Sequence, residues 1–359
     1  MFNKHNIFVP SLCLLLAACS GGDPLSSIAD LQPEPTAPTN PGPPPPKPQD
    51  NLATSPPSGM TGRIVFLGQV NNEFGSVHMF LTLPDGSNTT SLNTLADPFS
   101  YTGPSWGPNG DKLVIASNQL GNAEWDIYTI NADGSGVSPI VAGPSSGDFA
   151  PSWSPDGSKI VFQSTTDDAL GFDIYLYDVD TQAITNLTNA PGDDELPSWS
   201  PDGTRVLFQG STIGGSAVSS GTNLFLISPD GTGLVALTSG VGGQNAAGMF
   251  SPDGAQIVYE STVHSPATTD RAQLGDFEIY VMNADGTDPV RLTTGVGTED
   301  VLRFPTWSPD GRHIAFEFHD FTANQLFSVT FIAVMNSDGS NIYLLPDLPV
   351  DGIFPRWGP

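Results

Sequence analysis

The sequence predicts an all-β fold, a six-bladed β-propeller, and three observations lead to this prediction. A short motif recurs: PSWSPDG at 151–157 and 197–203, PTWSPDG at 305–311, and degenerate copies at 104–110, 249–254 and 354–359. Its aromatic position recurs every 46 to 57 residues, at Trp106, Trp153, Trp199, Phe250, Trp307 and Trp357. This spacing lies just above the roughly 40–45 residues of one propeller blade. An apolar, strand-forming run follows the motif, as in Ile160-Val161-Phe162.

Each repeat predicts four strands. The first ends at the aromatic residue, and the Ser-Pro-Asp-Gly that follows is a tight turn, since Pro presets φ, Asp bonds backbone amides and Gly accepts positive φ. The second strand is the apolar run, and the third precedes another Asp-Gly turn, as Asp126-Ile127-Tyr128 does. The fourth ends in Leu-Thr, as at Leu187-Thr188. A blade with two apolar faces needs a neighbour on each side, which a closed ring provides.

The two ends of the repeat region complement each other. The first strand-forming run, Ile64-Val65-Phe66, lacks a first strand, and the last copy, at 353–357, lacks the other three. Pairing them completes a sixth blade and protects the sheet edges that an open array would expose.

These motifs resemble the TolB-type propeller repeat, with its W-S-P-D-G turn followed by an apolar strand and a D-I-Y strand. The resemblance covers about residues 62–359. It implies the propeller fold, but it specifies function weakly, because such repeats also occur in peptidase accessory domains and in lyases.

The chain before the propeller predicts export and tethering. Residues 1–18 have a basic start at Lys4, an apolar run and the sequence Leu16-Ala17-Ala18 before Cys19, which is typical of a lipoprotein signal peptide. Cys19 is the predicted lipidation site. By resemblance to bacterial lipoproteins, Ser20 after it favours sorting to the outer membrane, facing the periplasm, over retention in the inner membrane. Residues 19–60 are rich in proline and predict a disordered tether, so the propeller domain spans 61–359.

Composition narrows the partners. The formal net charge of −27 disfavours nucleic acid and favours cations or a basic partner. Cys13 and Cys19 are the only cysteines, so the predicted propeller contains no disulfide and no cysteine-based metal site. We expect a monomer held together by packing and ring closure.

Acidic residues precede several inner strands and are the predicted partner-binding site. If these segments are loops, the acids converge on the mouth of the central channel, where they would engage a basic peptide or a Ca²⁺ ion; a solvated acidic rim is the alternative. We expect no other cofactor. The residues are Asp148, Asp193, Asp194, Glu195, Glu299, Asp300 and Asp351.

Catalytic signals are weak. Gly143-Pro144-Ser145-Ser146-Gly147 matches G-x-S-x-G but lies in a propeller loop, where the nucleophile-elbow geometry does not form. The histidines have no metal-binding spacing, although His264 and Arg271 with nearby acids are candidates for a lyase-type site. We therefore expect a non-catalytic binding or scaffold propeller in the bacterial cell envelope, with a carbohydrate-binding or polysaccharide-lyase-like protein as the alternative.

Overall fold

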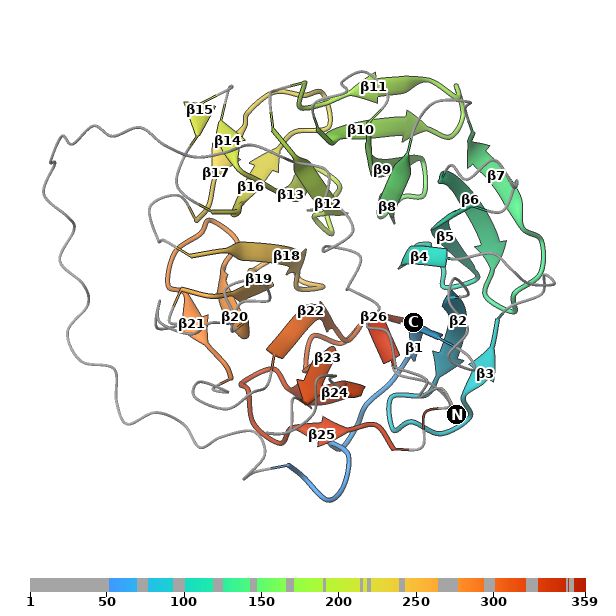
Figure 1. The fold of residues 1–359 in the computed structure, drawn as a ribbon, viewed down its shortest axis with the longest axis vertical. Coiled ribbons are helices and arrows are strands. Elements are labelled where there is room, and N and C mark those ends of the chain that lie inside the picture. Colours follow the sequence, from blue (N-terminus) through green and yellow to red (C-terminus); the bar gives the residue numbers. More distant parts are fainter. Residues whose placement is uncertain are drawn as a thin grey trace, which may run out of the picture.

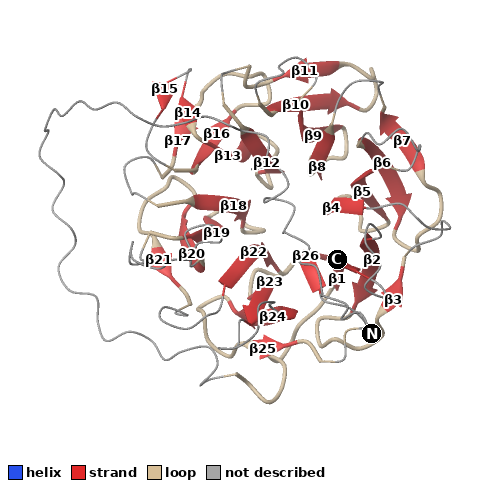
Figure 2. Ribbon diagram, viewed as in Figure 1, coloured by secondary structure: helices blue, strands red, loops and turns tan. Residues whose placement is uncertain are grey.

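The protein is a ring of β-sheets in a computed structural model. The structure describes residues 52–69, 77–92, 101–118, 125–142, 147–165, 171–189, 192–213, 216–217, 221–238, 243–263, 277–293, 301–320, 329–346, 348 and 352–359. Every regular element in these ranges is a strand (Figure 2). No helix in the described part of the chain has the length and apolar character needed to cross a membrane.

Six four-stranded antiparallel sheets form the six predicted blades. We number the blades along the chain and give their strands from the channel outward. Blade 1 is β26 (Gly352–Gly358), β1 (Arg63–Gln69), β2 (Val77–Thr82) and β3 (Thr90–Ser91); blade 2 is β4 (Tyr101–Trp106), β5 (Lys112–Ser117), β6 (Asp126–Asn131) and β7 (Ser138–Val141). Blade 3 is β8 (Asp148–Trp153), β9 (Lys159–Ser164), β10 (Asp173–Asp178) and β11 (Ile184–Asn186); blade 4 is β12 (Asp194–Trp199), β13 (Val206–Gly210), β16 (Asn223–Ile227) and β17 (Val235–Ala236). Blade 5 is β18 (Asn245–Phe250), β19 (Gln256–Ser261), β20 (Glu278–Asn283) and β21 (Val290–Arg291); blade 6 is β22 (Val301–Trp307), β23 (His313–Asp320), β24 (Val329–Asn336) and β25 (Tyr343–Leu344).

The first strand of each blade faces the centre of the ring and the fourth lies at the rim (Figure 1). A short hairpin, β14 (Thr212–Ile213) with β15 (Ser216–Ala217), decorates blade 4. The core lies between blades: Val114 and Ile127 of blade 2 pack with Ile160 and Phe162 of blade 3 in one buried cluster. Burial between sheets, rather than within one, therefore makes the blades mutually dependent.

The predicted ring closure is confirmed. β26 pairs with β1, with Ile64 opposite Trp357, so the last strand completes the first blade. The Trp357 indole N–H donates to the Thr61 carbonyl at 2.8 Å, and Arg63 Nη2 donates to the Gly110 carbonyl of blade 2 at 2.8 Å. The two extremities of the propeller are thus joined to each other and to the next blade.

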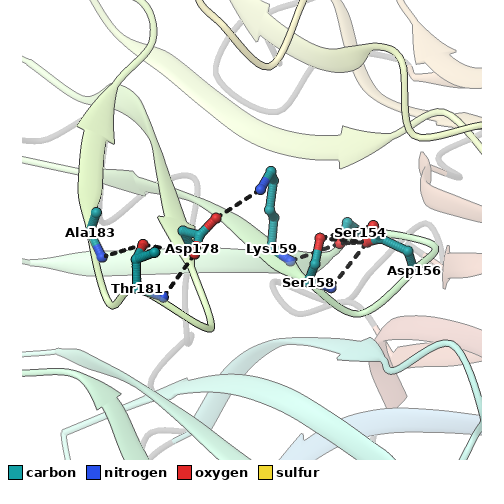
Figure 3. A network of polar contacts seen from close by, with 7 residues as sticks. All are labelled: Ser154, Asp156, Ser158, Lys159, Asp178, Thr181 and Ala183. Atoms are coloured by element: carbon teal, nitrogen blue, oxygen red, sulfur yellow. Dashed lines mark hydrogen bonds and ion pairs between the residues drawn. The ribbon is translucent and has the colours of Figure 1, made fainter.

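The turn after the inner strand is held by its own side chains (Figure 3). In blade 3 the Ser154 hydroxyl donates to Asp156 at 2.6 Å, and the Ser158 amide donates to the same carboxylate at 3.0 Å. These bonds lower the pKa of Asp156 to about 2, with the Ser154 hydroxyl as the largest cause. Lys159 extends the network to Asp178 through an ion pair of 2.8 Å.

Every inner strand carries a bulge with one residue at positive φ, three positions before the aromatic residue. We call these six the bulge residues: Gly103, Ala150, Leu196, Ala247, Phe304 and Phe354. A non-glycine residue in this region is strained, so the surrounding structure must hold it there.

A side chain from the preceding blade binds the bulge amide at four of the six blade junctions. The acceptor always lies on the second strand: Gln163 binds the Leu196 amide at 2.9 Å, and Gln209 binds the Ala247 amide at 3.0 Å. Glu260 binds the Phe304 amide at 2.7 Å, and Glu317 binds the Phe354 amide. At the other two junctions the equivalent residues are Leu67 and Ala116, which have no side-chain acceptor. We call each of these side-chain-to-amide bonds a latch. Latches therefore join four consecutive junctions, from blade 3 round to the closing blade 1.

Candidate binding site in the central channel

The central channel contains a pocket lined by the inner strands of five blades. Its wall comes from β4, β8, β12, β18 and β26, with Gln163 from β9. The bulge residues shape it: Phe354 lines the pocket, and its ring centroid lies 4.2 Å from that of Phe304. Gly103, Ala150 and Ala247 line the pocket and are small, which leaves space on their side.

The two arginines of the channel have different surroundings. Arg303 forms an ion pair with Glu260 at 2.9 Å and lies over the rings of Phe277 and Phe304. Arg356 lines the pocket, and its Nη1 donates to the Pro355 carbonyl at 3.0 Å. Burial lowers the pKa of Arg356 to about 10, although the carboxylates of Glu317 and Glu260 oppose this shift. It remains a cation at neutral pH.

Three half-buried aromatic side chains meet beside the pocket. The Phe149 ring lies 5.4 Å from Trp125 and 5.8 Å from Phe172, measured between centroids, and Phe149 itself lines the pocket. Backbone bonds fix two of them, because the Asp148 amide donates to the Trp125 carbonyl and the Asp194 amide to the Phe172 carbonyl. We call Trp125, Phe149 and Phe172 the aromatic cluster. Its position by the start of β8 places it on the face of the ring where the inner strands begin, which is the predicted channel mouth.

Two of the predicted site acids differ from the expectation of exposed loop residues. Asp148 and Asp194 are the first residues of β8 and β12, and both are buried. Burial raises the pKa of Asp194 to about 7, opposed by a bond from the Thr188 hydroxyl. The same hydroxyl has one proton, which it shares between Asp194 and Asp173 of blade 3, the latter at 3.1 Å. The Asp194 carboxyl therefore faces Thr188, two residues beyond β11 of the preceding blade, and its side chain is not on an open rim.

The neighbouring acids are closer to the expectation. Asp193 is exposed in the loop before β12, and its carboxylate accepts the Phe172 amide at 3.1 Å, which ties it to the aromatic cluster. Glu195 is half-buried and accepts a bond from Gln209 Nε2 at 3.0 Å. Burial raises the pKa of Glu195 to about 7. Asp193 therefore places a carboxylate beside the cluster, whereas the Glu195 side chain lies against Gln209 of β13.

The other predicted site residues lie outside the described ranges. These are Glu299, Asp300, Asp351 and the lipidation site Cys19, together with His264 and Arg271. Within the described residues, no three acid, histidine or cysteine side chains gather in a way that would hold a metal. The calcium site at the channel mouth therefore stays a prediction.

A buried histidine forms a hydrogen-bonded chain in blade 6. His319 contacts Glu317 at 2.8 Å through Nε2 and the Thr330 hydroxyl at 3.3 Å through Nδ1. All three side chains are buried, and none lines the channel pocket. Since Glu317 also binds the Phe354 amide, we interpret the chain as support for the latch at the closing blade.

Sequence reasoning missed the main components of the pocket. Arg356, Phe149 and the small bulge residues have ordinary local sequences, and none of them matches a functional motif. A usable signal exists once the repeats are aligned on the aromatic residue. The position before it is Ser, Ser, Ser, Met and Thr in the other five copies and Arg at 356.

Comparison with known proteins supports the fold. No family model and no curated protein matches the sequence. Among solved structures, TolB from Acinetobacter baumannii matches with a TM-score of 0.65 and 21% identity, covering 84% of this chain and 68% of that one. A putative TolB from Agrobacterium tumefaciens matches with a TM-score of 0.57 and 20% identity, covering 84% of this chain and all of that one. An oligogalacturonate lyase in complex with manganese has a TM-score of 0.50 and 16% identity, covering 78% and 73%.

The chain is therefore a TolB-like six-bladed β-propeller with a pocket in its central channel. The likeness establishes the fold, and the chemistry of the site has to come from its own residues.

Proposed function

We propose that this protein is a non-catalytic binding or scaffold propeller of the bacterial cell envelope, and that it binds a protein or peptide at the channel mouth. The observation that carries the proposal is the channel pocket, which five blades share and the aromatic cluster borders. Aromatic side chains beside a concave site supply large contact areas at low entropic cost, as in many protein interfaces. The TolB-like fold supports a scaffold role of this kind.

The partner carries basic groups where it meets the mouth. The Asp193 carboxylate is tied to the aromatic cluster through the Phe172 amide, and the whole chain has a net charge of −27. A field of this sign speeds the approach of a basic partner and weakens with salt.

Anchoring places the site in the envelope. Lipidation at Cys19 attaches the chain to a membrane, by our proposal the outer membrane on its periplasmic side, and residues 19–60 span the distance to the propeller. The propeller acts as a monomer, and its channel mouth is open to the partner protein or peptide.

A carbohydrate ligand is the second candidate. The half-buried aromatic cluster offers a face on which a sugar ring would stack, and an oligogalacturonate lyase shares the fold. A lyase-like activity would also require a base at the site, for which His264 is the candidate residue.

Affinity capture from envelope extract tests the proposal, with a parallel glycan array and an assay for new reducing ends. We expect capture of a protein that Asp193→Lys weakens and that added salt releases. Asp180→Lys is the matched control, because Asp180 is an exposed acid on the turn after β10, at the opposite face. Equal capture by both variants, or a glycan signal without protein capture, would refute the proposal.

A further inference from the structure

Arg356 occupies a special position in the channel. It precedes Trp357 in β26, and the equivalent residues of the other inner strands are Ser105, Ser152, Ser198, Met249 and Thr306. Arg356 is therefore the one charged member of this ring of six described residues. Ser105, Ser152 and Ser198 line the same pocket.

The nearby acids are already bound by other groups. One Glu260 oxygen pairs with Arg303 and the other accepts the Phe304 amide. One Glu317 oxygen accepts the Phe354 amide and the other contacts His319. Neither forms an ion pair with Arg356 among the described residues, and the bond that the Arg356 side chain makes there goes to the Pro355 carbonyl.

A guanidinium has five N–H donors in a planar fork, and among the described residues the side-chain donor of Arg356 with an acceptor is Nη1. Taking a charge out of water is costly unless a counter-charge and hydrogen bonds compensate. The planar fork matches a carboxylate in a bidentate geometry. The hydroxyls of Ser105 and Ser152, on the next two blades, add donors at the same level of the channel.

We propose that Arg356 binds a carboxylate of the partner peptide, an Asp or Glu side chain or the C-terminus, inserted into the channel pocket. This rests on the proposed function for the location of the partner. The partner therefore carries two kinds of group: a carboxylate that enters the channel and binds Arg356, and basic groups that meet Asp193 at the mouth. The partner is thus a peptide with an acidic residue flanked by basic ones.

Isothermal titration with two short probes tests the anchor directly. The peptides are acetyl-Lys-Gly-Asp-Gly-Lys-amide and the same peptide with Asn in place of Asp, so that their carboxylate is the only difference. We expect the Asp peptide to bind at least about tenfold more tightly than the Asn peptide, the range of a charge-assisted bidentate pair. Arg356→Gln removes this preference, whereas Arg312→Gln, at an exposed turn, keeps it.

Each result of the titration either supports or refutes the carboxylate anchor. Equal affinity for the two peptides, no binding of either at millimolar concentration, or an unchanged preference in Arg356→Gln overturns the proposal. Binding of a galacturonate trimer in place of the Asp peptide overturns the peptide assignment. If Arg356→Gln does not fold, Arg356→Lys serves instead, and its preference for Asp falls because a lysine lacks the planar fork.

Failure of the anchor is distinguishable from failure of the proposed function. Loss of the Asp preference with intact capture of an envelope protein would refute the anchor alone. A retained Asp preference without any captured protein would refute the proposed partner class and leave the carboxylate site in place.

Discussion

The latch between blades makes a quantitative prediction at Gln163. This side chain is 1% exposed, and its Oε1 accepts the Leu196 amide of the next blade at 2.9 Å. Gln163→Leu keeps a similar volume but leaves the Leu196 amide without its acceptor. An unsatisfied buried amide costs about 1–3 kcal/mol.

The thermal consequence follows from the size of the domain. With an unfolding entropy of roughly 2.1 cal/mol/K per residue over about 300 residues, 2 kcal/mol corresponds to a fall in Tm of about 3 °C. Calorimetry measures this fall, and amide hydrogen exchange at Leu196 reports the same junction locally. We expect faster exchange there than at Ala247, whose latch on Gln209 is untouched.

Gln256→Leu is the matched control, since Gln256 is an exposed residue at the start of β19. A Tm of Gln163→Leu within 1 °C of the wild type, together with unchanged exchange at Leu196, would refute the latch. Equal losses in both variants would show that the glutamine itself, and not its position, sets the effect.

Three further predictions concern pH and closure. Glu195 has a pKa of about 7 in the fold against an ordinary value near 4.5, so the native state holds a proton that the unfolded state releases between these pH values. The free energy of unfolding therefore falls as pH rises from 4.5 to 7, by roughly 3 kcal/mol at most. Glu195→Gln should have a higher melting temperature than the wild type at pH 8 and the same one at pH 4, and a lower melting temperature at pH 8 would contradict this. The turn aspartates have lowered pKa values, so protonating them costs stability as pH falls through their folded pKa values toward about 2. Together with the raised pKa values of Glu195 and Asp194, this predicts that the protein is most stable near pH 4–5, as measured by denaturation monitored by tryptophan fluorescence. Greatest stability at pH 8 would contradict this prediction. Trp357→Ala removes a buried side chain from the closing strand and should destabilise by about 3–5 kcal/mol in urea titration, whereas a loss below 1 kcal/mol would mean that closure contributes little.

The fold was predictable because repetition multiplies weak signals. One Ser-Pro-Asp-Gly turn says little, but four copies and a Gly-Pro-Asn-Gly variant in register with apolar runs specify blade size, strand order and ring closure. The strands that contain Trp357 and Ile64 could be paired from sequence because each end lacked what the other supplied. The turn aspartates were likewise assigned a structural role, which the Asp156 network bears out.

The site was less predictable, because it depends on which way side chains point. Asp194 and Glu195 are adjacent in sequence, yet Asp194 contacts Thr188 of blade 3 and Glu195 contacts Gln209 of blade 4. Alternation along a strand sends neighbours to opposite sides, so counting acids near an inner strand does not place them on the rim. The pocket depends on small bulge residues in three different repeats, and only the assembled ring brings these together.

Occupancy of the channel by a partner is the central claim, and site-specific photo-cross-linking in intact envelopes tests it most directly. A photoreactive residue at Ser152 lines the pocket, and one at Val290 lies exposed on the outer strand β21. We predict a discrete cross-linked protein from position 152, lost in Arg356→Gln, and none from position 290. A cross-link from position 290 with none from position 152 would show that partners bind the rim of the ring and would contradict the account.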